Sequence, residues 1–244
     1  MARAWPADQA DWISLREEIV SCRKCPRLVR YRESVARKKR RAFADWEYWG
    51  RPVPGFGDPK ARLLVIGLAP AAHGGNRTGR IFTGDRSGDW LYRALYEFGF
   101  ANQPTSVHRD DGLELHDAYV TAVVRCAPPQ NRPERKEIVR CRPFLMREWT
   151  MLPVRVVVAL GQIAFRGAVE TWQEISGEVL RPVPRFAHGA GVRLGDVLLI
   201  ASYHPSQRNT QTGFLTRPMF HKIFRLAREH LQQCTSESGK GRNE

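Results

Sequence analysis

The sequence predicts an α/β protein, a three-layer α/β/α sandwich around a four-stranded and mainly parallel sheet. Four short apolar runs are rich in β-branched residues and continuous rather than alternating, which is typical of strands covered on both faces. Amphipathic helix patterns lie between these runs, and such alternation of strands and helices favours a parallel sheet. Because the chain has 244 residues, it can bury the core of one large domain. The four strand candidates are Ala61–Leu68, Ala118–Arg125, Val154–Leu160 and Val197–Ser202.

Five segments carry apolar residues at helical spacing. In the first of them, Asp8 is placed to cap the helix. The turn-forming segment Gly50–Pro59 is expected to be a loop. We expect residues 1–234 to form one domain and the small, polar residues 235–244 to be a disordered tail. The helix candidates are Ala7–Val20, Gly88–Phe98, Pro133–Trp149, Gln162–Val169 and Arg217–Leu231.

The formal net charge of +14 indicates a partner that is anionic, and nucleic acid above all. A chain that is basic only for solubility stays open as an alternative. No run of 18 apolar residues exists, and the first residues lack the apolar core of a secretory signal, so we expect a cytoplasmic protein without a membrane partner. Neither a P-loop nor a dinucleotide-binding pattern of glycines is found, which argues against a nucleotide cofactor.

Four of the five cysteines suggest a metal centre, because disulfides are uncommon in the cytoplasm. Cys22 and Cys25 form a C-x2-C pair, and Cys126 and Cys141 follow much later in the chain. Their spacing fits either a four-cysteine zinc site or an iron–sulfur cluster, and it leaves open that they are buried hydrophobic residues. Cys234 lies near the predicted tail and is expected to be a free thiol.

Polar and aromatic residues follow three of the strand candidates directly. The segment Gly67–Gly88 comes after the first strand, is rich in glycine, and is far longer than an ordinary connection of about four to six residues. The carboxyl ends of parallel strands share one edge of the sheet, where open α/β sheets bind their ligands. We therefore expect four residues to converge in one crevice there: Phe82, Asp85, Asn131 and His204.

These four residue types suit the recognition of a flat heterocycle. Phe82 offers a face for stacking, and the side-chain amide of Asn131 matches an imide edge. His204 can donate a hydrogen bond to a developing anion, and Asp85 can orient a water molecule. Each residue also has a plainer interpretation, because Asp85 could only cap the following helix, His204 could only shape a turn and Asn131 could be a loop residue.

Three segments resemble, in order, the family 5 (type B) uracil-DNA glycosylases, the iron–sulfur branch of the uracil-DNA glycosylase superfamily. They are GLAPAAHGGNRTGRIFTGDRSG, VVRCAPPQNRP and HPSQRNTQTG. The resemblance runs from Cys22 to about Leu231 and implies an α/β/α sandwich around a four-stranded parallel sheet. It also implies hydrolytic removal of uracil, and of other deaminated bases such as hypoxanthine, from DNA. A [4Fe-4S] cluster on Cys22, Cys25, Cys126 and Cys141 is implied as well.

The resemblance assigns roles to individual residues. Phe82 would stack on the flipped base and Asn131 would read its edge, while Gly67 and Ala69 would lie at the floor of the base pocket. Ala69 stands where the best-known members of the superfamily carry a polar residue that places the water, and Asp85 would take over that role. DNA contacts are expected from His73, Asn76, Arg77 and Arg80 in the first motif, and from Ser206, Gln207, Arg208 and Asn209 after His204.

Two other classes of protein stay open from the residues themselves. A non-enzymatic nucleic-acid-binding protein with zinc or an iron–sulfur cluster on its four cysteines would explain the charge and the thiols, but not Asp85 and His204. A nucleoside hydrolase or phosphorylase is the weaker alternative. Because the three motifs contain no lysine, we expect hydrolysis without a Schiff base and without strand cleavage. We also expect the protein to be a monomer.

Overall fold

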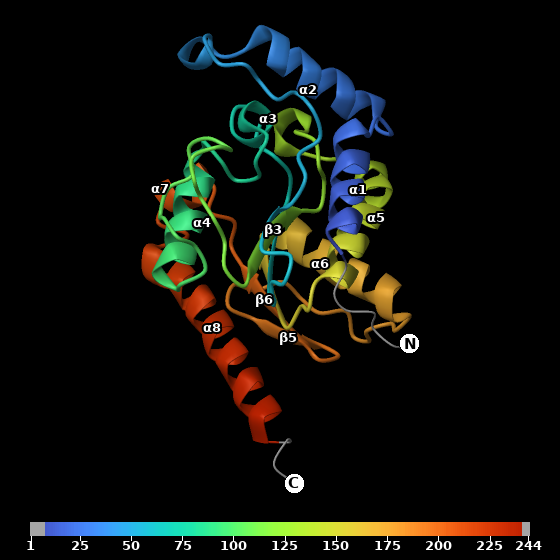
Figure 1. Ribbon diagram of the computed structural model, residues 1–244, viewed down its shortest axis with the longest axis vertical. Helices are drawn as coiled ribbons and strands as arrows, with labels where there is room; N and C mark the ends of the chain where they lie inside the picture. The colour runs from blue at the N-terminus through green and yellow to red at the C-terminus, as the bar shows by residue number, and fades with distance from the viewer. Residues whose placement is uncertain (1–7, 241–244) are drawn as a thin grey trace.

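The centre of the protein is a six-stranded mixed sheet with helices on both faces (Figure 1). The computed structural model describes residues 8–240. The strand order is β1-β3-β2-β4-β6-β5, and the four inner strands are parallel, whereas β1 and β5 pair antiparallel at the two edges. The strands are β1 (Phe56–Gly57), β2 (Leu63–Gly67), β3 (Ala118–Ala122), β4 (Val156–Leu160), β5 (Gly191–Leu194) and β6 (Val197–Ser202). The predicted fold class is therefore confirmed, with two short edge strands added to the four predicted ones.

Each inner strand is buried on both sides, as its continuous apolar run predicts. In β2, Leu63 and Val65 pack into the core beneath α4 and α8, whereas Leu64 and Ile66 face the core beneath α5 and α6. Figure 1 shows α4 and α8 on one side of the sheet and α1, α5 and α6 on the other. Alternate residues of one strand thus supply two separate cores, which explains why the run contains no polar positions.

The helices mostly agree with the predicted segments. The long helices are α1 (Gln9–Ser21), α2 (Pro26–Lys38), α4 (Arg86–Glu97), α5 (Arg135–Met151), α6 (Gln162–Ser176) and α8 (Arg217–Lys240); the short ones are α3 (Gly75–Thr78) and α7 (Gln207–Gln211). Asp8 caps α1 by accepting from the Asp11 backbone N–H, and the predicted start at Ala7 lies outside the described residues.

One long helix is added to the predicted ones. The basic segment after Cys25 forms helix α2, which begins with Pro26 at its first position, where proline is favoured. At the other end, α8 continues through Lys240 into the segment expected to be disordered, and residues 241–244 lie outside the described part. None of the helices within residues 8–240 combines the length and the apolar composition that a membrane crossing requires.

Candidate active site

The loop after β2 folds back on itself, and its glycines make room for side chains of the same loop. An ideal Cβ on Gly67 would lie 2.6 Å from ring atoms of Phe82, and one on Gly74 would lie 2.1 Å from Asp85 Oδ2. Both distances are far below van der Waals contact, so only glycine fits at either position. These two glycines therefore let an aromatic ring and a carboxylate of the same loop approach the backbone.

Phe82 is held over the end of β2 in an unusual backbone conformation. Its φ is +52°, in the left-handed region that costs a bulky residue on the order of 1–3 kcal/mol. The side chain is only 6% exposed, and its ring is stacked on that of His204 with centroids 5.9 Å apart and an angle of 29° between the planes. Strain of this kind clusters at functional sites, so the geometry keeps Phe82 a candidate site residue.

Asp85 caps helix α4 and is half-buried against Gly74. Its Oδ1 accepts a hydrogen bond from the backbone N–H of Gly88 at 3.0 Å, while Oδ2 lies next to Gly74. Burial raises the pKa of Asp85, although the backbone hydrogen bonds from Gly88 and Ser87 act in the opposite direction. The capping interpretation is therefore correct, and it leaves the second oxygen available for another partner.

His204 follows β6 directly and brings an uncharged imidazole to the Phe82 ring. Its Cβ lies 3.3 Å from an ideal Cβ on Gly161, the residue after β4. Burial lowers the pKa of His204 to about 4, so its ring is neutral at pH 7. Among residues 8–240 no hydrogen bond to either ring nitrogen is found. A neutral imidazole in this position can donate one N–H to a ligand.

Asn131 is not brought into contact with the other predicted residues. It lies at the end of a short 3-10 turn, Pro129–Asn131, with a φ of +55°, and its side chain is exposed. Ala69 is half-buried and packs against the core beneath α5 and α6. In the structure Phe82 thus stacks on His204, and Asp85 lies in the same loop as Phe82. The convergence of Asn131 with these residues stays a prediction.

Three of the predicted DNA contacts have to be corrected, because the side chains are buried and engaged inside the protein. Asn76 donates to the backbone oxygen of Arg32 at 3.2 Å. The Arg77 guanidinium lies between the rings of Phe43 and Trp46, 3.9 and 4.0 Å from their centroids. The exposed fractions are 0% for Asn76, 3% for Arg77 and 4% for Arg80.

Arg80 is tied down by a carboxylate distant in sequence, since its Nη2 lies 2.8 Å from Asp111. The other predicted contacts lie nearer the surface. His73 is half-buried and shares a hydrogen bond of 3.0 Å with the Tyr48 hydroxyl. Ser206 caps α7 and Asn209 donates to His204 O at 2.9 Å, so both shape the segment that carries the exposed Gln207 and Arg208.

Four thiols line one cavity next to this edge of the sheet, and all are free. Burial raises the pKa of Cys126 to about 11 and that of Cys141 to about 12, and the lowering effects of Arg32 and Arg125 offset this only in part. Arg32 donates from Nη1 to Cys126 Sγ at 2.9 Å, and the Arg125 backbone N–H donates to Cys141 Sγ at 3.3 Å. Within the described residues, no group of His, Cys, Asp and Glu side chains is arranged to hold a single metal ion. The cavity is formed by Cys22, Cys25, Cys126 and Cys141 together with Arg32 and neighbouring side chains.

Sequence reasoning missed Arg32 and a buried ion pair beside the thiols. Arg32 lies seven residues after Cys25, on the same face of α2, which is the signal that could have indicated it. The ion pair joins Arg125 Nη2 to Glu148 Oε2 at 2.5 Å, with 2% and 0% of the side chains exposed. Nothing local in the sequence links these two residues, because they belong to different elements.

Comparison with known proteins places this fold and site. Residues 54–228 match the family model of the uracil DNA glycosylase superfamily, so the protein belongs to that superfamily of α/β proteins. The chain is 53% identical to a type-5 uracil-DNA glycosylase of Mycobacterium bovis over 85% of its length and 77% of the relative's. It is 51% identical to that of Mycobacterium leprae, over 88% and 93%, and 49% identical to that of Thermus thermophilus, over 87% and 94%. The protein is therefore a member of the type-5 uracil-DNA glycosylase family.

Proposed function

We propose that this protein removes uracil from DNA by hydrolysis of the N-glycosidic bond and leaves an abasic site. The observation that carries the proposal is the pairing of a strained, buried Phe82 with a neutral His204 at the carboxyl edge of the sheet. The names of the type-5 relatives point to the same reaction. The net charge of +14 suits a polyanionic substrate.

The reaction needs a stacking surface, a donor to the leaving base and a place for water. The target nucleotide is flipped out of the duplex, which costs a few kcal/mol and least for a mispaired base. Phe82 stacks on the base, and Asn131 pairs with its edge. As the N-glycosidic bond breaks, its electron pair moves onto the uracil ring, and the N–H of His204 stabilises the resulting anion.

Asp85 completes the reaction on the sugar. Its free Oδ2 orients a water molecule and balances the positive charge that develops at the sugar carbon. The water oxygen bonds to that carbon, Asp85 accepts the proton that the water loses, and one proton is returned through solvent to the uracil anion, so the products are an abasic sugar and free uracil. No Schiff base forms, and the strand stays intact.

Ala69 gives the base pocket a wall without a polar group. A pocket that lacks such a group discriminates weakly between bases, because no buried donor or acceptor is left unpaired by the wrong one. We therefore include other deaminated bases, such as hypoxanthine, among the substrates.

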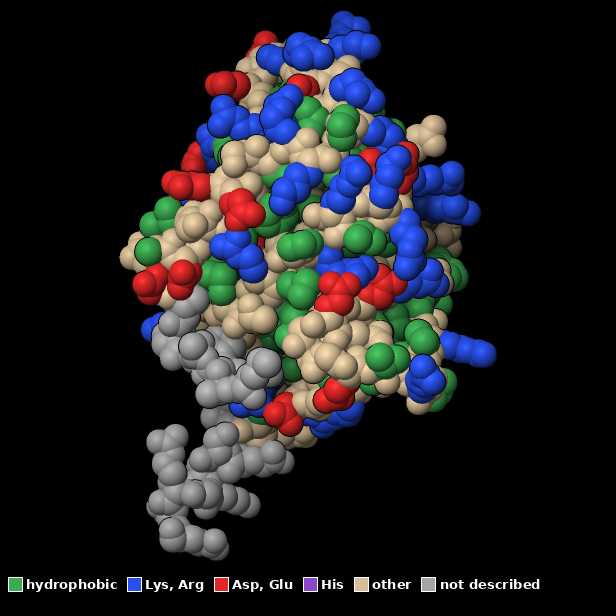
Figure 2. Space-filling model, turned by 90° about the vertical axis from the view of Figure 1, so that its right-hand side faces the viewer, with side chains coloured by type: hydrophobic (Ala, Val, Ile, Leu, Met, Phe, Trp, Pro, Cys, Tyr) green, Lys and Arg blue, Asp and Glu red, His purple; other side chains and the backbone are tan. Residues whose placement is uncertain are grey.

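DNA is held by groups at the surface near the site. Gln207 and Arg208 on α7 approach the duplex near the lesion, with His73, Ser206 and Asn209 beside them. Figure 2 shows Lys and Arg side chains gathered over the upper half of the face that carries α1, α2 and α5. We propose that the protein acts as a monomer.

The four thiols fit an iron–sulfur cluster better than a single zinc ion. They share one cavity, and in the described part of the chain no His, Asp or Glu joins them as a further ligand of a single ion. Two of the sulfurs already accept hydrogen bonds, which stabilise thiolate ligands. A [4Fe-4S] cluster would be held by Cys22, Cys25, Cys126 and Cys141, and it supplies a structural cross-link, because hydrolysis transfers no electrons.

One assay tests the proposal. The protein is incubated with oligonucleotides that carry uracil or hypoxanthine, as single strands and as duplexes. Free base and alkali-labile sites should appear with uracil, and no strand should break before alkali is added. Iron content and visible absorption of the purified protein test the cluster separately. A protein that binds DNA but releases no base would be the non-enzymatic alternative.

The neutral state of His204 predicts how stability depends on pH. In the unfolded chain the imidazole binds a proton below about 6.5, whereas in the folded protein it stays neutral until about 4. The unfolded state therefore binds more protons between these values, and the free energy of unfolding falls as the pH falls through this window. A His204→Gln variant lacks this contribution. Urea denaturation at about pH 7.5 and pH 5 should show a loss about 2 kcal/mol smaller in the variant; equal losses would contradict a neutral, half-buried His204.

A further inference from the structure

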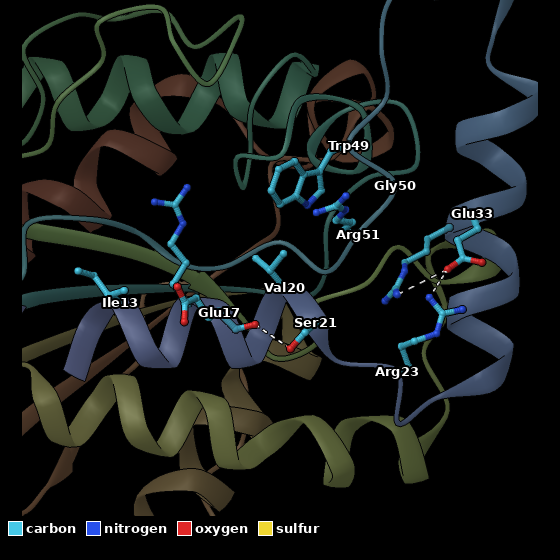
Figure 3. Close-up of a pocket in the computed structure, with 11 residues that line it drawn as sticks. Ile13, Glu17, Val20, Ser21, Arg23, Glu33, Trp49, Gly50 and Arg51 are labelled. Carbon is cyan, nitrogen blue, oxygen red and sulfur yellow. Dashed lines mark hydrogen bonds and ion pairs between the residues drawn. The ribbon is translucent and has the colours of Figure 1, made fainter. Parts of the chain in front are cut away.

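A second cleft lies between α1, α2 and the loop that carries Trp49, and its volume is about 690 Å³. Figure 3 shows Trp49, Gly50 and Arg51 across the cleft from Val20 and Ser21 of α1, with the ion pair of Arg23 and Glu33 on the side of α2. The cleft adjoins the loop Gly67–Gly88, because the backbone N–H groups of Trp49 and Gly50 donate to the backbone oxygens of Arg77 and Asn76 at 2.9 and 3.0 Å. It is therefore close to the active site and yet separate from it.

Cations outnumber carboxylates in this cleft. Four arginines and two glutamates line it, and Glu33 is shared by Arg23 at 2.7 Å and Arg32 at 4.0 Å. The remaining arginines, Arg16 and Arg51, are exposed, and neither has an ion-pair partner within residues 8–240. Two unpaired guanidinium groups facing one cleft suit a phosphate, which a guanidinium binds with two parallel hydrogen bonds.

Arg32 links this cleft to the thiol cavity. Its side chain is 3% exposed, and its guanidinium donates to Cys126 Sγ at 2.9 Å and to the backbone oxygen of Cys22 at 3.4 Å. Because Arg32 lines both the cleft and the thiol cavity, it lies between the two.

Trp49 forms an aromatic wall of the cleft and is fixed in place. Its indole N–H donates to Pro52 O at 3.0 Å, and its ring presses on Gly79, where an ideal Cβ would lie 2.9 Å away. The guanidinium of Arg51 lies 5.8 Å from the ring centroid. A fixed indole beside arginines is the combination that proteins use to hold a nucleotide by its base and its phosphate.

We infer that this cleft binds a backbone phosphate of the DNA strand that extends from the active site, with Arg16 and Arg51 as its phosphate ligands. The inference rests on the proposed function only in naming DNA as the source of the phosphate. It assigns a second region of DNA contact to the part of the protein that surrounds the four thiols.

The test is equilibrium binding of a fluorescent, uracil-free duplex to the full chain. Arg16→Gln combined with Arg51→Gln should weaken binding about tenfold. The slope of log affinity against log salt, measured between about 50 and 200 mM, should decrease by about 1, because one phosphate contact is lost. The matched control is Arg155→Gln with Arg193→Gln, two exposed arginines at the amino ends of the strands, which removes the same charge and should change neither quantity.

Two results would overturn the inference. One is wild-type affinity and salt slope in the Arg16 and Arg51 variant. The other is binding of inorganic phosphate or thymidine monophosphate that depends on these arginines, together with duplex binding that does not. That result would make the cleft a site for free anions. Replacing both arginines by lysine keeps the charge but not the paired hydrogen bonds, so it should retain the salt slope and only part of the affinity. Failure of the proposed function would show differently, as absence of uracil release by the unsubstituted protein.

Discussion

Replacing Asp85 by asparagine is expected to lower uracil excision by about 10² to 10⁴-fold while the fold stays intact. Asparagine caps a helix as well as aspartate does, so the hydrogen bond from the Gly88 N–H is kept. What is lost is the negative charge on Oδ2 that the proposed mechanism needs for the water and the sugar. Single-turnover release of uracil from a U:G duplex measures the loss of excision rate. The midpoint temperature of thermal unfolding should change by no more than about 2 °C.

Two further variants separate charge from position. Asp89→Asn removes an exposed carboxylate in the same first turn of α4 and should leave excision nearly unchanged. Gly74→Ala keeps Asp85 but places a methyl group 2.1 Å from Oδ2, so the carboxylate has to move and activity should fall as well. Gly191→Ala, whose new methyl would meet its nearest neighbour at 3.4 Å, is the control for adding a methyl group. Full activity of Asp85→Asn would refute the role of this residue.

The sheet could be predicted from the sequence because its inner strands are buried on both faces. Burial of alternate residues in two different cores forces continuous apolar runs, and such runs are visible without any alignment. The edge strands carry no such signal, since β1 has two residues and β5 includes the exposed Arg193. Helix α2 was hidden for a related reason, because arginines outnumber its two fully buried apolar residues, Leu28 and Val29.

The sequence indicated where the candidate site lies, but not how its side chains are arranged. Because Phe82, Asp85 and His204 follow strands that are parallel, they were predicted to lie at the same, carboxyl edge of the sheet. The burial of Arg77 and Arg80 could not be predicted, because their partners Trp46 and Asp111 are distant from them in the sequence. An arginine in a glycine-rich loop has the same local pattern whether it binds DNA or a distant carboxylate.

Replacing Glu148 by glutamine is expected to destabilise the protein by about 3 to 5 kcal/mol, because it leaves the charge of Arg125 buried without a partner. Glu148 accepts from Arg125 at 2.5 Å and from the hydroxyls of Thr121 at 2.6 Å and Tyr119 at 3.3 Å. The midpoint temperature of thermal unfolding should fall by roughly 10 °C or more. Glu18→Gln is the matched control, since it breaks an ion pair with Arg147 that is about half exposed and should cost less than about 1 kcal/mol.

The position of Arg125 gives this ion pair a consequence for the thiols. Arg125 precedes Cys126, and its backbone N–H donates to Cys141 Sγ, so displacing its side chain also displaces two of the four thiols. A variant with Arg125→Met and Glu148→Leu removes both charges at once and should recover much of the lost stability, because no buried charge is left unpaired. If the double variant is no more stable than Glu148→Gln alone, then packing around Glu148 and not the unpaired charge accounts for the loss. Retained iron in the double variant, with iron lost from Glu148→Gln, would show that the ion pair serves to hold the thiol segment in place.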